Sequence, residues 1–122
     1  MNKKFIVPFD TARQLREKGY DVDCYSYYTQ NGKLYHDTFT LNNKWIRMGR
    51  FLAPTYHEVL DWLEEKGIYV TTCIDMLEVC GSGKIKWACF IFPFGGKETS
   101  IGGKHNREEA LNEAIKAALE ML

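Results

Sequence analysis

Residues 42–50, NNKWIRMGR, have the composition best suited in this chain to contacting a nucleic acid. The basic side chains of Lys44, Arg47 and Arg50 are interleaved there with the ring of Trp45. Lysine and arginine contact backbone phosphates and an indole ring stacks on a base, so this spacing is typical of a small nucleic-acid site. The alternative is that Trp45 is buried while the charges stay in water, and the general tendency of tryptophan to be buried favours it.

A second basic pair, Lys104 and Arg107, lies just ahead of an expected C-terminal helix. The first amides of a helix have no intrahelical acceptor, so together with these cations they indicate a weak site for a phosphate or carboxylate. The alternative is that Gly102 and Gly103 simply form the turn from a strand into the helix and the charges are solvated. We favour this alternative because every helix start offers such amides.

The histidines and cysteines show no spacing typical of a metal site. They are His36, His57, His105, Cys24, Cys73, Cys80 and Cys89. There is no His-Glu-x-x-His and no Cys-x-x-Cys pair, so we expect no metal and no cofactor. A cysteine paired with a histidine would be needed for nucleophilic catalysis, and nothing singles one out. We therefore assign no catalytic residue, and an enzyme of unknown class stays the least favoured function.

The composition is that of a globular protein, and its overall charge gives no positive electrostatic field that would attract polyanions. The chain has 122 residues, 45% of them apolar and 26% charged, with a formal net charge of zero. Residues 1–50 and 84–107 are net positive, whereas 51–83 and 108–122 are net negative. We expect a single α+β domain over residues 1–122. The N-terminal apolar run is too short for a signal peptide and no run could span a membrane, so we expect a cytoplasmic protein with no membrane partner.

Capping and turn signals predict the secondary structure. A helix is expected to follow Pro8 and stop at Gly19, and a second to start at Thr55 with Glu58 as its capping-box partner and stop at Gly67. Asn31-Gly32, between two tyrosine-rich strands, predicts a hairpin with a type I′ turn. The two helices share an ending of Glu-Lys-Gly and an apolar residue. A duplicated α-β-β unit or shared capping chemistry would explain this echo, and we favour the second.

The C-terminal residues 106–122 predict an amphipathic helix that runs to the last residue. Its cap is Asn106, with Glu109 as the partner in a capping box. Its apolar stripe comprises Ala110, Leu111, Ala114, Ile115, Ala118, Leu119 and Leu122. We expect this helix to cover the strand within 85–94 (IKWACFIFPF), which is apolar on both faces.

The complete pattern predicts a two-layer fold of order α-β-β-α-β-β-β-α. One mostly antiparallel sheet of four or five strands is expected to be covered on one face by the second and third helices, with the first helix at an edge. The open side of the tyrosine-rich hairpin and of strand 85–94 would then be an apolar patch that favours a partner.

Three segments resemble a group of short proteins from Bacteroidetes phages and other mobile elements. They are VPFDTARQLREKGYD (7–21), APTYHEVLDWLEEKGI (53–68) and REEALNEAIKAALEML (107–122). The matching residues belong to caps and core, so the resemblance implies a shared fold and a phage or mobile-element origin, and it carries over no catalytic residue. We therefore expect a small non-enzymatic accessory protein that forms a homodimer or binds a protein partner. Nucleic-acid binding through the segment around Trp45 is the alternative.

Overall fold

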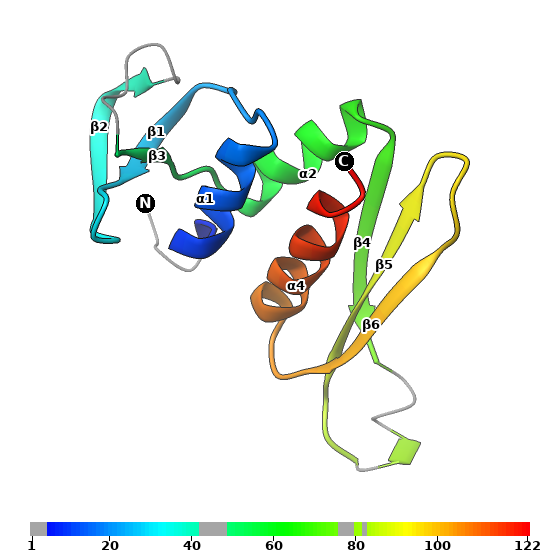
Figure 1. Ribbon diagram of the computed structural model, residues 1–122. Helices are drawn as coiled ribbons and strands as arrows, with labels where there is room; N and C mark the ends of the chain where they lie inside the picture. Colours follow the sequence, from blue (N-terminus) through cyan, green and yellow to red (C-terminus); the bar gives the residue numbers. More distant parts are fainter. Residues whose placement is uncertain (1–4, 42–48, 76–79, 82) are drawn as a thin grey trace.

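The computed structural model describes residues 5–41, 49–75, 80–81 and 83–122, and it has an α+β fold (Figure 1). The first half contains α1 (Phe9–Glu17), β1 (Cys24–Tyr28), β2 (Leu34–Leu41) and β3 (Phe51–Leu52). The second half contains α2 (Tyr56–Glu65), β4 (Ile68–Ile74), β5 (Trp87–Pro93), β6 (Thr99–Lys104) and α4 (Arg107–Leu119). The α+β class is confirmed.

The expectation of one sheet with four or five strands is wrong. The strands form two antiparallel sheets of three strands each, in the orders β2-β1-β3 and β4-β5-β6. The predicted order lacked β3, a two-residue strand whose Phe51 and Leu52 pair with Tyr28 and Tyr27. Two residues are too few to show the alternation that identifies a strand in sequence. β3 pairs with the edge of β1 that β2 leaves free and so completes the smaller sheet.

The hairpin between β1 and β2 is confirmed, but its turn type is not. Gly32 donates its N–H to the carbonyl of Thr29 at 2.9 Å, and the Thr29 N–H donates to the carbonyl of Lys33 at 2.9 Å. Gly32 has φ of +83°, whereas the described non-glycine residues, Asn31 among them, all keep negative φ. This is a type I turn followed by a left-handed glycine, the three-residue hairpin geometry, instead of type I′.

The capping signals of the first two helices are confirmed. The N–H of Tyr20 donates to the Leu15 carbonyl at 2.9 Å and that of Gly19 to the Arg16 carbonyl at 3.1 Å, which is the Schellman pattern. Thr55 caps α2 in a complete capping box with its glutamate partner. The two halves differ in topology, however. The first strand after α1, β1, is central in the smaller sheet, whereas the second strand after α2, β5, is central in the larger sheet. Shared capping chemistry therefore explains the sequence echo better than duplication.

The C-terminal helix lies across the larger sheet, as predicted (Figure 1). Six of its seven predicted stripe residues are buried: Ala110, Leu111, Ala114, Ile115, Ala118 and Leu119. The seventh, Leu122, lies beyond the helix end at Leu119 and is exposed. Asn106 caps the helix by accepting the Glu109 N–H at 2.7 Å. Cys89 and Ile91 of β5 are fully buried in the same core.

Helix α1 is not at the edge of the larger sheet as expected; it lies between the smaller sheet and α4 (Figure 1). The hydroxyl of the fully buried Thr11 donates to Oδ1 of Asn112 on α4 at 2.5 Å. On the other side, the Tyr28 hydroxyl donates to the Val7 carbonyl just before α1, at 2.7 Å. One continuous cluster of buried apolar side chains consequently extends through both halves of the chain.

Candidate functional site

The basic segment predicted to bind nucleic acid is represented in the structure by Arg50. Lys44, Trp45 and Arg47 lie outside the described residues. The Arg50 guanidinium is 5.0 Å from the centre of the Tyr27 ring, and the Arg50 carbonyl accepts a hydrogen bond from the Arg16 guanidinium. Arg50 therefore packs on the smaller sheet, as a cation over an aromatic face.

The predicted anion-binding pair lies at the far end of the larger sheet. Lys104 is the last residue of β6, opposite Trp87 of β5, and Arg107 is the exposed first residue of α4. Nearby, Nζ of Lys86 is 2.9 Å from Nδ1 of His105, a contact in which the ammonium donates. The structure thus brings Lys104 and Arg107 to one end of the sheet, but on a different sheet from Arg50.

The turn before α4 is not formed as expected, because Gly102 and Gly103 belong to β6. An extra residue on β6 interrupts its register with β5 between Ile101 and Lys104. Oδ2 of Asp75, which follows β4, accepts the Gly103 N–H at 2.9 Å. The two glycines therefore form a β-bulge that Asp75 holds in place.

The three histidines lie on different elements and do not converge. Nδ1 of His36 is 2.6 Å from Oγ of Ser26, and Nε2 of His57 is 3.6 Å from Oδ2 of Asp61. Ser26 and His36 face each other across β1 and β2, and Ser26 is only 2% exposed. Within the described ranges, no group of three or more histidine, cysteine, aspartate or glutamate side chains is placed to hold a metal ion.

The larger sheet has one face covered by α4 and one open face. We define the open face as the side chains that alternate with the buried Cys89 and Ile91 and their strand partners. Its members are Tyr69, Thr71, Cys73, Ala88, Phe90, Phe92 and Ser100. Tyr69 lies directly opposite Phe92, and the two are 45% and 40% exposed. The rings of Phe90 and Phe92 stack with centres 6.4 Å apart.

The open face continues past the end of β5 to Phe94, which is 90% exposed. Each of the seven side chains that form the face is uncharged, and three are aromatic. Exposed aromatic side chains grouped on one sheet face are the usual signature of a contact surface, whereas a single exposed apolar residue is not. The sequence indicated this surface, since it predicted an apolar patch on the uncovered side of strand 85–94.

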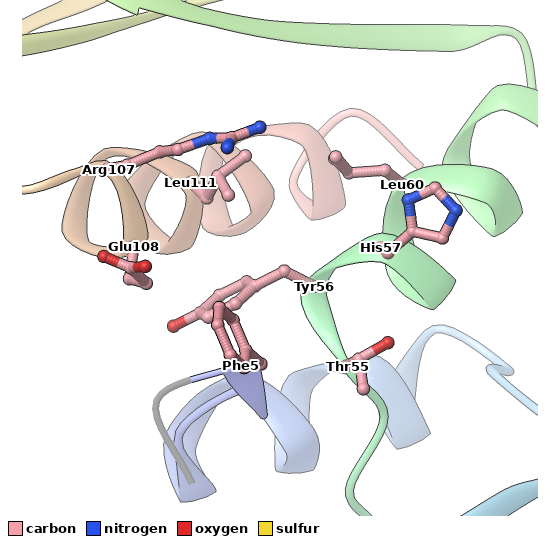
Figure 2. A pocket seen from close by; sticks show the side chains of 8 residues that line it. All are labelled: Phe5, Thr55, Tyr56, His57, Leu60, Arg107, Glu108 and Leu111. Carbon is pink, nitrogen blue, oxygen red and sulfur yellow. The ribbon is translucent and has the colours of Figure 1, made fainter. Parts of the chain in front are cut away.

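A cavity of about 340 Å³ lies between the first turns of α2 and α4 (Figure 2). Its lining comprises Phe5, Thr55, Tyr56, His57, Leu60, Arg107, Glu108 and Leu111. Burial and, to a smaller extent, the nearby Glu108 carboxylate raise the pKa of the Tyr56 phenol to about 12. Figure 2 shows the Tyr56 ring crossing the cavity toward Glu108, with the Arg107 side chain along the opposite side.

Sequence reasoning missed this cavity, although it identified Arg107 as part of a weak anion site. The lining comes from the N-terminal segment, α2 and α4, which are far apart in sequence. The capping signals at Thr55 and Asn106 located both helix starts but contained nothing to show that the two starts lie side by side.

Comparison of the chain with protein-family models, with curated proteins and with solved structures gave no match. In the part of the chain that the structure describes, no helix is long and apolar enough to cross a membrane.

Proposed function

We propose that this protein is a non-enzymatic interaction module that self-associates through the open face of the larger sheet. The observation that supports this is the grouping of Tyr69, Phe90 and Phe92 on a face with no charged member. The highly exposed side chain of Phe94 borders this face. A second copy of the chain is the partner we favour. Two uncharged faces pack without electrostatic repulsion, and the sheets of two copies stack as in a β-sandwich.

The size of the open face sets the strength of this association. Strands of seven residues at about 3.3 Å per residue, three strands wide at about 4.8 Å, give a face of roughly 300 Å². Stable interfaces bury about 800 Å² on each partner, so the face alone supports a weak, reversible contact. We therefore expect a monomer–dimer equilibrium in the micromolar range or weaker, instead of an obligate dimer.

Sedimentation equilibrium between micromolar and millimolar chain concentration tests this proposal. We expect Phe92→Thr to weaken dimerisation by about tenfold or more, because it removes a central aromatic side chain and leaves a strand-forming residue. Tyr25→Thr is the matched control, since Tyr25 is a 51% exposed aromatic residue on a strand of the smaller sheet. A chain that stays monomeric at millimolar concentration, or an equal effect of both substitutions, would refute self-association through this face.

Binding of a single-stranded nucleic acid is the second candidate, and the basic end of the larger sheet favours it. Lys86 and His105 are in contact there, and Lys104 and Arg107 are close in sequence. Aromatic rings on a sheet with basic residues at one end can stack bases and contact phosphates. Fluorescence anisotropy with single-stranded and duplex oligonucleotides over a salt series tests this, and affinity must fall with salt and weaken in Lys104→Gln.

The proposed setting is an accessory role in a phage or mobile element, in the cytoplasm, and the resemblance of three segments to short phage proteins supports it. The four cysteines are free thiols in the structure, which suits a reducing compartment. The genes that neighbour this one test the setting: a conserved position outside phage and mobile-element genes would argue against it.

A further inference from the structure

The cavity of Figure 2 contains a tyrosine hydroxyl that the fold itself does not use. Tyr56 is 8% exposed, yet among the described residues its hydroxyl has no hydrogen-bond partner, and it is not sealed away from solvent. Tyr28 behaves differently, because its hydroxyl donates to the Val7 carbonyl at 2.7 Å. Buried tyrosine hydroxyls normally find a partner. Because the Tyr56 hydroxyl opens into the cavity and is not used by the fold, it is available to a group bound there.

Two side chains of opposite charge line the same cavity. Arg107 and Glu108 are neighbours in the first turn of α4, and both line the cavity. Within the described residues, neither is in an ion pair; the ion pair found there joins His57 and Asp61. In Figure 2 the Arg107 side chain runs along one side of the cavity toward Leu60, while Glu108 lies at the other end, beyond the Tyr56 ring.

The remaining lining is apolar and supplies a surface for the body of a ligand. Leu111 lies next to the Arg107 side chain, Leu60 lies beyond its tip, and Phe5 lies beside the Tyr56 ring (Figure 2). A volume of about 340 Å³ is at the small end of the range for small-molecule sites. An anionic ligand would leave Glu108 unpaired beside it, and a cationic ligand would do the same to Arg107, so neither suits both charges.

We propose that this cavity binds a small zwitterion with an apolar body, of the size of an aromatic amino acid. The guanidinium of Arg107 pairs with its carboxylate. The carboxylate of Glu108 and the hydroxyl of Tyr56 accept hydrogen bonds from its ammonium group. Phe5, Leu60 and Leu111 contact the apolar body. This site shares no residue with the open face, so it is independent of self-association.

Three indole compounds that differ in their charged groups test the proposal: L-tryptophan, tryptamine, which lacks the carboxylate, and indole-3-propionate, which lacks the ammonium. Titration into the ¹⁵N-labelled protein is followed by amide chemical shifts. We expect tryptophan to shift the amides of residues 55–60 and 107–111 and to bind about tenfold more tightly than either analogue, since each analogue loses one charge-assisted contact.

Variants then assign each contact. Arg107→Gln should abolish the preference for tryptophan over tryptamine, and Glu108→Gln the preference over indole-3-propionate. Tyr56→Phe should lower the affinity for tryptophan several-fold without changing the shape of the cavity. Glu113→Gln, on the next turn of α4 and outside the cavity lining, is the matched control and should leave all three affinities unchanged.

The proposal is overturned if no compound shifts these amides at millimolar concentration, or if the shifts map to the open face. It is equally overturned if the three compounds bind alike, because the cavity would then recognise the indole ring and not its charges. Amide spectra of the free variants check that each retains the fold, so that a loss of binding reports on the contact removed.

Discussion

Gly102 lies so close to Asp75 that adding a single methyl group should change the stability measurably. A Cβ at Gly102 would lie 2.5 Å from Oδ2 of Asp75, closer than real Cβ contacts. The same oxygen accepts the Gly103 N–H at 2.9 Å and so holds the bulge in β6. Gly102→Ala must therefore displace the carboxylate and weaken this hydrogen bond.

The magnitude follows from two opposing terms. A hydrogen bond to a charged acceptor contributes about 1.5–3 kcal/mol, and because this one is exposed we take about 1.5 kcal/mol. Gly102 is not among the residues with positive φ, so alanine fits its backbone and gains about 0.5 kcal/mol by restricting the unfolded chain. We expect Gly102→Ala to lower the free energy of unfolding by about 1 kcal/mol.

A double-mutant cycle in urea, followed by tryptophan fluorescence, isolates the contact with Asp75. In an Asp75→Ala background the displaced carboxylate is absent, so Gly102→Ala should become stabilising by about 0.5 kcal/mol. Gly81→Ala is the control, because a methyl group there meets no described atom within 4 Å. Equal destabilisation by Gly102→Ala in both backgrounds would refute the reasoning, as would a wild-type effect no larger than that of Gly81→Ala.

Three further outcomes are expected. The thiols of Cys24 and Cys89 are buried, and burial raises the pKa of each to about 12, so at pH 8 iodoacetamide should label the two exposed cysteines first and these two on unfolding. Mass spectrometry of the native protein checks this, and four equally fast modifications would contradict it. Because both thiols keep their protons in the folded state, the unfolded chain binds fewer protons above its usual thiol pKa of 9.0, and stability should fall between about pH 9 and pH 12. Urea midpoints over this range should fall less steeply in Cys89→Ala. Asn112→Ala leaves the buried Thr11 hydroxyl without its acceptor and should cost about 1–3 kcal/mol, with much of the loss recovered in the double variant Thr11→Val/Asn112→Ala. Thermal unfolding measures the stability of the single and the double variant. If the effects of the two substitutions simply added, the result would contradict the pairing of Thr11 with Asn112.

The open face and the cavity differ in how far the sequence could predict them. Alternation along strand 85–94 already indicated side chains on two faces, and the C-terminal helix could cover only one of them. The cavity depends instead on the approach of Tyr56 to Glu108, which lie on different helices. No local pattern contains such a distance, because it results from how both helices pack on the sheet.

Local chemistry in the sequence determined several ends of the elements and the buried side of the C-terminal helix. The Thr55–Glu58 capping box, the stop at Gly19 and the buried stripe of α4 each depend on residues within about one or two helical turns of each other, so neighbouring residues suffice to specify them. Tertiary structure decided the rest. The two residues of β3 pair with β1 and complete a separate sheet, and Asp75 accepts a hydrogen bond from Gly103 in the bulge of β6. These features depend on contacts between distant segments, whose free energy is gained only once the whole core has assembled.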